Sequence, residues 1–121
     1  MNKEYIESLL REEVIVSTIS KLRTQFNNKI TEFYFFKVFI EVLQSLGIKS
    51  ELCSSSYINN DNSVVTDYKL TLWENENNKY KCMYDHDKLL KDLDNYNAAQ
   101  EGKGMHKSAH DLIDIFIGLL E

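Results

Sequence analysis

The chain contains no proline and only two cysteines, Cys53 and Cys82, in 121 residues. Two cysteines cannot supply the several disulfides that hold small secreted scaffolds together, so an apolar core must stabilise this fold. The first residues lack the apolar stretch of a secretory signal, and the most apolar run, 33–46, is interrupted by Lys37 and Glu41. These absences predict a cytoplasmic protein without a membrane span and with two free thiols. The alternative for the cysteines is a Cys53–Cys82 disulfide between adjacent strands.

Excess positive charge is also absent, because the net charge is −5. Residues 1–50 carry seven basic and six acidic side chains (+1), and residues 51–121 carry seven basic and thirteen acidic ones (−6). Each contact to a nucleic-acid phosphate needs a positive group, so this balance disfavours nucleic acid as a partner. The same charge balance favours a basic or nucleic-acid-binding protein as the partner.

The residues that are present describe an ordinary globular protein. The chain is 43% hydrophobic and 12% aromatic, which is enough apolar material for one packed core in a chain of this length. No repeat, low-complexity tail or linker interrupts it. We therefore expect a single domain over 1–121.

Two helices are predicted at the start. Residues 3–26 have helical spacing, but their apolar side chains do not keep one stripe, so we expect a bend or break near 12–14. The β-branched run 14–20 is also compatible with a strand. A second helix is predicted over 29–46, capped by Asn27 or Asn28 and ended by Gly47.

The second helix is apolar around most of its circumference. Lys37, Glu41 and Gln44 occupy one narrow arc, while phenylalanine, tyrosine and aliphatic side chains cover the rest. Such a helix must be covered on several sides. We expect its phenylalanines to be sheltered by a sheet and by other helices or a second chain.

The apolar spacing changes to two after residue 48, which indicates strands. Strands are predicted at 48–58, 67–73 and 79–84, as a three-stranded antiparallel meander. Helical spacing returns after Asp85 or Asp87, either of which can cap a helix, and the glycine-containing segment 100–104 separates this helix from the last one. The predicted fold class is therefore α+β, with two N-terminal helices, the meander and two C-terminal helices.

One helical stretch has the spacing of a metal site. His106, His110 and Asp114 recur every four residues, so all three can lie on one face of a helix. Lys107 occupies the position where a metalloprotease motif has glutamate. The simpler interpretation is a solvated His110–Asp114 pair, with His106 at the helix start, and we predict no metal and no cofactor.

Two neighbouring segments offer alternative ligand sites. Lys103 and Lys107, near the glycines that precede the last helix, can receive a phosphate, with His106 and His110 beside them. Asp85, His86 and Asp87 can join these histidines if the two helices are antiparallel, although capping of a helix explains them more simply.

An interaction surface is predicted where acidic residues follow an aromatic side chain. Aromatic side chains supply buried area, and charges supply selectivity. The alternative is a solvated acidic face with the tryptophan packed beneath a helix. The predicted partner-binding residues are Trp73, Glu74, Glu76, Asp85, Asp87, Asp92 and Asp94.

No serine, cysteine or histidine arrangement indicates a catalytic site, so an enzyme is not expected. The leading hypothesis is a small acidic binding protein, bacterial or from a phage, that occludes a basic protein partner, as inhibitors, immunity proteins and phage counter-defence proteins do. A homodimer is compatible with it. The alternative hypothesis is a protein that binds a phosphorylated metabolite, a nucleotide or a metal through 102–114.

Overall fold

The first helical segment consists of two helices. The computed structural model describes residues 3–24, 29–73, 79–81, 86–100, 102 and 104–120, and it shows α1 at Lys3–Leu10 and α2 at Glu13–Thr24. The break falls at residues 11–12, slightly before the predicted position, and Val16 N starts a new helical ladder by donating to Glu12 O at 2.9 Å. Residues 14–20 are therefore helical rather than a strand, and the break expected within 3–26 is confirmed as a division into two helices.

Helix α3, Glu32–Ser45, begins later than predicted and ends as predicted. Its N-cap is Thr31, whose hydroxyl accepts from the Tyr34 amide, rather than Asn27 or Asn28. Gly47 has a φ of +78°, and Ile48 N donates to Leu43 O at 2.9 Å. This is a Schellman motif, which needs the left-handed conformation that glycine adopts without strain.

The sheet consists mainly of one long hairpin. Strands β1, Lys49–Ile58, and β2, Val64–Trp73, pair antiparallel along their whole length, and β3, Lys79–Lys81, adds three residues to β2. Asn59 N donates to Ser63 O at 2.8 Å and closes the hairpin loop. The antiparallel order is as expected, and β3 covers the described residues 79–81 of the predicted strand 79–84, of which residues 82–84 lie outside the described part.

The two C-terminal helices form an antiparallel pair. Helix α4 spans His86–Ala98 and α5 spans Met105–Leu119. The Tyr96 and Ser108 hydroxyls are hydrogen-bonded, which joins the end of α4 to the start of α5. His86 therefore lies at the opposite end of the pair from His106, and the gathering of histidines considered from the sequence does not form.

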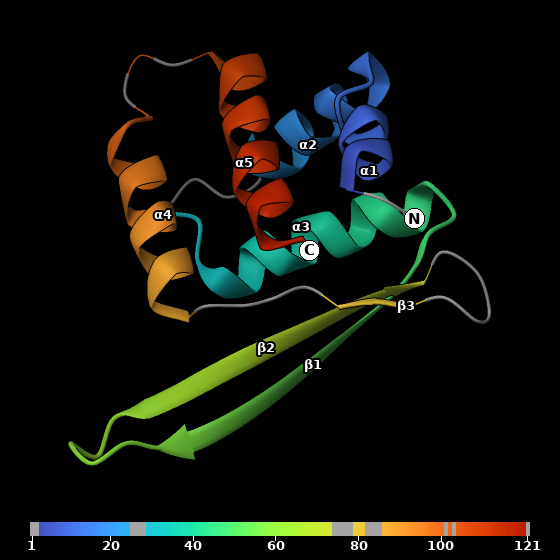
Figure 1. Cartoon of the computed structure of the whole chain (residues 1–121). Coiled ribbons are helices and arrows are strands. Elements are labelled where there is room, and N and C mark those ends of the chain that lie inside the picture. The colour runs from blue at the N-terminus through green and yellow to red at the C-terminus, as the bar shows by residue number, and fades with distance from the viewer. Residues whose placement is uncertain are drawn as a thin grey trace.

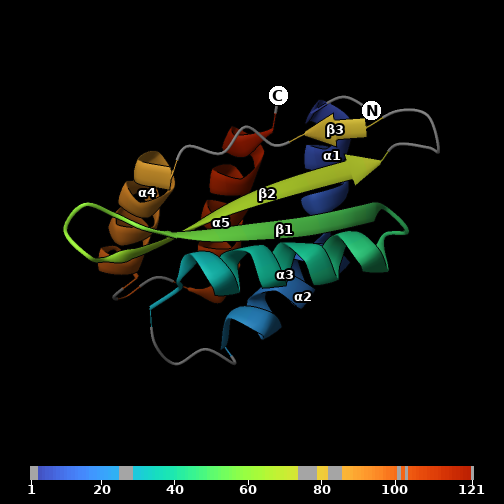
Figure 2. The same ribbon diagram turned by 90° about the horizontal axis from the view of Figure 1, so that it is seen from below.

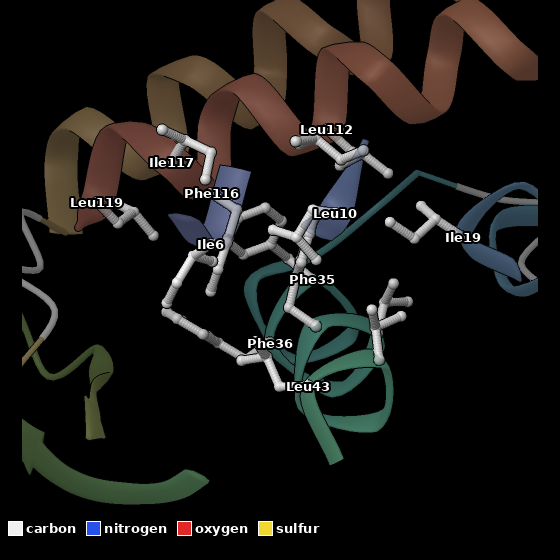
Figure 3. Close-up of a cluster of buried hydrophobic side chains, with 14 of the residues drawn as sticks. Ile6, Leu10, Ile19, Phe35, Phe36, Leu43, Leu112, Phe116, Ile117 and Leu119 are labelled. Atoms are coloured by element: carbon white, nitrogen blue, oxygen red, sulfur yellow. The ribbon is translucent and has the colours of Figure 1, made fainter. Parts of the chain in front are cut away.

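Helix α3 lies between the hairpin and the other helices (Figure 1). Its buried phenylalanines belong to one core with side chains from α1, α2 and α5, and Figure 3 shows Phe35 and Phe36 of α3 near Phe116 of α5. On the other side Phe36 contacts Tyr68 of β2, with ring centroids 5.2 Å apart. The described residues thus form one small α+β domain, with three helices before the sheet rather than the expected two.

None of the helices in the described part of the chain has the length and apolar character needed to cross a membrane.

Candidate interaction surface

Arg11 joins the break between α1 and α2 to helix α5. Its Nη1 donates to His110 Nδ1 at 2.9 Å, its Nη2 donates to Asp114, and its Nε donates to Glu7 Oε1 at 3.1 Å. The interpretation of His110 and Asp114 as a solvated pair was therefore incomplete, because both bind the same guanidinium. Sequence spacing within one helix cannot reveal a partner 99 residues away.

The electrostatics of this cluster favour the charged guanidinium. Partial burial acts to lower the pKa of Arg11, but hydrogen bonds and charge attraction from Asp114 and Glu7 outweigh it and raise that pKa above its ordinary value. Because arginine has no acceptor, His110 must present an unprotonated Nδ1 to it. The cluster is an imidazole and two carboxylates around one guanidinium.

His106 lies beside this cluster on the same helix. Its Nε2 is 3.4 Å from Glu13 Oε2, and its ring centroid is 4.7 Å from that of His110. Within the described residues, no group of three histidine, cysteine or acidic side chains is placed to hold a metal ion. Arg11 already binds His110 and Asp114 through the lone pairs that a metal ion would need.

The phosphate alternative rests on residues that the structure describes only in part. Gly104 is the N-cap of α5 and offers no side chain to the helix start, and Lys107 is exposed one turn later. Lys103 lies outside the described residues. The ligand-binding prediction for Lys103, Lys107, His106 and His110 therefore remains a prediction.

Trp73 lies among cations. It ends β2 half-buried, with Lys49 Nζ 5.0 Å and Lys79 Nζ 5.9 Å from its ring centroid. Both distances are within cation–π range, and both lysines are cross-strand partners of Trp73. The assignment of Trp73 as a partner-binding residue remains a prediction.

The predicted acidic residues do not gather around Trp73 in the described part of the chain. Asp87, Asp92 and Asp94 belong to α4, which lies at the opposite side of the molecule from the end of β2 (Figures 1 and 2). Glu74, Glu76 and Asp85 lie outside the described residues.

Helix α4 contributes instead to a groove against α5. The groove has a volume of about 510 Å³, and its lining includes three carboxylates, of Asp92, Asp111 and Asp114, together with Lys88. Apolar atoms of Ile115 and other side chains form part of the same lining. Such a groove is suited to a basic side chain with an apolar stem.

The distal half of the hairpin, residues 54–58 and 64–67, is here named the hairpin arm. It diverges from the helical layer toward its tip (Figure 1). Tyr57, Ile58 and Val64 are 50%, 73% and 70% exposed. Ile58 and Val64 are cross-strand partners, so their side chains form one apolar patch near the tip.

Phe33 extends the exposed apolar surface onto α3. It is 53% exposed in the single chain, so neither the sheet nor the other helices shelter it, and its cover by a second chain stays a prediction. A groove of about 370 Å³ between Phe33 and Val64, Val65 and Tyr68 separates α3 from the arm. The sequence indicated this exposure, because Phe33 lies on the same helical arc as Lys37 and Gln44.

A second groove, of about 400 Å³, lies on the other side of Phe33 and is here named the α3–β1 groove. It runs where α3 lies beside β1 (Figure 2). Side chains from both elements form its walls. They are Phe33, Lys37, Ile40, Glu41 and Gln44 of α3 and Ser50 and Leu52 of β1.

Sequence reasoning placed the interaction surface on Trp73 and the acidic residues, whereas the exposed apolar side chains lie on the arm and α3. A fold of helices around a hairpin does not by itself indicate a function. The functional argument therefore depends on these surfaces. No protein-family model, curated protein sequence or solved structure matches the chain.

Proposed function

We propose that this chain is a small, acidic, non-enzymatic binding protein that occludes the surface of a protein partner. The contact surface is the hairpin arm together with the adjoining face of α3, which we name the arm face. Its exposed apolar members are Phe33, Ile58 and Val64, and Tyr57 is exposed on the other side of the arm. The proposal thus moves the contact from the surface predicted around Trp73.

The exposed apolar side chains of the arm face carry this proposal. In the described part of the chain, eight large apolar residues are exposed, and three of them, Phe33, Ile58 and Val64, gather where the arm faces α3. Single exposed apolar residues are normal, but a cluster flanked by grooves is typical of a protein interface. The hairpin arm also projects beyond the helices (Figure 1), so it can reach and cover the surface of a partner.

The negative charge supports a basic partner. Asp87 and Asp94 are exposed on α4, and Asp92 lines the neighbouring groove, so charge can steer a basic protein during approach. The apolar arm face then supplies the buried area. In this division, charge affects mainly the association rate, and the arm face affects mainly the lifetime of the complex.

A pair of matched valine variants tests the proposal. Val64 on the arm and Val14 on α2 are 70% and 67% exposed, so Val64→Asp and Val14→Asp introduce the same charge at equal exposure on different faces. Affinity capture from the native host with mass spectrometry, combined with light scattering of the purified protein, should detect one stoichiometric partner or a homo-oligomer. Val64→Asp should abolish this association and Val14→Asp should retain it.

A strictly monomeric protein that recovers no partner would contradict the proposal. Equal loss of binding in both valine variants would instead assign the effect to added charge and remove the arm face from the interface. Circular dichroism of both variants shows whether each remains folded, and exposed substitutions of this kind usually change stability little.

A further inference from the structure

Strand β1 forms one edge of the described sheet. The strand order is β1-β2-β3, so β1 pairs only with β2, and every second residue directs its main-chain N–H and C=O away from the sheet. Such an edge is a template for another strand. Natural edges are commonly protected by prolines, bulges or charges; β1 contains no proline, and its charged residues are Lys49 and Glu51, beside the groove residues Ser50 and Leu52.

The α3–β1 groove runs along this edge and has a helix for its far wall. Its α3 residues extend from Phe33 to Gln44, a length of about 16 Å at the helical rise. An extended segment of about five residues has the same length. Apolar atoms of Phe33, Ile40 and Leu52 line the groove, so it can receive apolar side chains of such a segment.

The groove also carries two charges without partners. Lys37 and Glu41 are exposed, and neither makes an ion pair within the described residues. They are one helical turn, about 6 Å, apart along α3. Two residues of an extended strand span about 6.6 Å, so an acidic and a basic side chain at positions i and i+2 match both charges.

The wall formed by β1 contains an unsatisfied hydroxyl. Ser50 Oγ is buried and has no hydrogen-bond partner among the described residues. A buried hydroxyl without a partner is unfavourable, and native proteins contain few of them. A main chain bound beside β1 brings new donors and acceptors to this wall.

From these features we infer that the α3–β1 groove binds an extended segment of a partner protein, which adds to β1 as a further strand. On the side directed at α3, the segment carries an apolar, an acidic and a basic residue at positions i, i+2 and i+4, which face Phe33, Lys37 and Glu41. The inference rests on the proposed function, because it specifies how part of the partner is held. Five residues bury much less area than a standard interface, so the isolated segment should bind with a dissociation constant on the order of 10 µM.

The test begins with a library of random heptapeptides displayed on phage and selected on the purified chain. The selected peptides should share the alternation of residues on the side directed at α3 and the two opposite charges. In a ¹H–¹⁵N spectrum, a synthetic copy of a selected peptide should shift the amide signals of α3 and of Lys49–Ser54 most strongly. No enrichment, or shifts confined to another face, would overturn the inference.

Backbone methylation distinguishes strand addition from simple apolar binding. N-methyl groups on one alternate set of peptide amides should weaken binding at least tenfold, because those amides donate to β1. Methyl groups on the other set should weaken it much less. Equal effects of the two sets would contradict strand addition even if the peptide occupies the groove.

Charge exchange tests the contacts to α3. The double variant Lys37→Glu with Glu41→Lys should weaken binding of the selected peptide by about three- to fivefold, as expected for exposed ion pairs. A peptide with its two charges exchanged should restore binding to this variant. Lys69→Glu, an exposed change on the opposite face of the sheet, is the control and should have no effect.

The two proposals fail in different ways. If the peptide experiments fail but Val64→Asp still abolishes capture of the whole partner, the groove inference is wrong and the arm face remains an interface. If peptides bind in the groove but Val64→Asp leaves capture unchanged, the groove is a site and the arm is not part of the interface.

Discussion

Phe39 of α3 and Phe116 of α5 stack face to face, with ring centroids 4.3 Å apart and ring planes 2° apart. Both side chains are fully buried. Phe35 packs against both rings, with centroids 5.1 Å and 6.3 Å away. This aromatic cluster joins the helix beside the hairpin to the C-terminal helix, so the position of the arm face depends on it.

We therefore expect Phe116→Ala to destabilise the protein by about 3–5 kcal/mol, since it removes a large buried side chain and leaves a cavity. Phe116→Leu should cost roughly 1–2 kcal/mol because most of the volume is kept. Urea unfolding followed by circular dichroism measures both. Met105→Ala, an exposed change on the same helix, should have little effect, and a loss as large as that of Phe116→Ala would contradict this account of the core.

Arg11 should contribute modestly to stability. Its side chain is 29% exposed and that of Asp114 is 63% exposed, so solvent weakens their attraction. Arg11→Ala should cost about 1 kcal/mol, from lost hydrogen bonds to His110, Asp114 and Glu7. Arg11→Lys should recover only part of this, because an ammonium cannot reproduce the guanidinium fork.

The salt dependence of that loss separates its causes. If charge attraction is part of it, the difference between the wild type and Arg11→Ala should shrink between 0.1 M and 1 M sodium chloride. A loss above about 3 kcal/mol would be too large for a partly exposed cluster and would show that α1 cannot dock without Arg11.

Two glycines should respond oppositely to alanine. Gly47 has a φ of +78°, and the space that a Cβ would fill there is open, so Gly47→Ala is disfavoured by its backbone conformation alone and should cost about 1 kcal/mol. Gly118 lies within α5 and also has free space for a methyl group. Gly118→Ala should stabilise by roughly 0.5–1 kcal/mol through helix propensity. Thermal unfolding of the two variants should shift in opposite directions.

The sequence predicted the elements whose signals are local. Gly47 and Ile48 marked the end of α3 because a left-handed stop depends on two adjacent residues. The alternation of Tyr68, Leu70 and Leu72 indicated a strand because one face of β2 is buried. The α+β class followed from these local periods.

Features that depend on distant residues could not be predicted in this way. Arg11 binds His110 and Asp114 across about a hundred residues, and no spacing within α1 indicates that contact. The separation of Trp73 from α4 likewise follows from the direction of the long hairpin, which no local pattern sets. The exposure of Phe33 was the exception, since its position on the arc of Lys37 and Gln44 already favoured the solvent side.

The hairpin loop should show a pH-dependent carboxylate. Asp61 accepts hydrogen bonds from the Ser63 hydroxyl and from the Ser63 amide, the latter at 2.9 Å, and these bonds lower the pKa of Asp61 below its ordinary value of 3.8. A group whose pKa is lower in the folded state stabilises the fold above its unfolded pKa. This contribution is lost as the pH falls through the folded value. Acidification below pH 3.8 should therefore loosen the loop that supports the arm.

Carbon-13 NMR of the Asp61 carboxyl group measures this shift directly. In the wild type the titration midpoint should lie below 3.8, and Ser63→Ala should move it upward because the hydroxyl donor is removed. Ser63→Thr keeps a hydroxyl and should stay close to the wild type. Identical midpoints in the wild type and Ser63→Ala would show that the side-chain bond does not form in solution, and the loop would then be held mainly by its main-chain bond between Asn59 and Ser63.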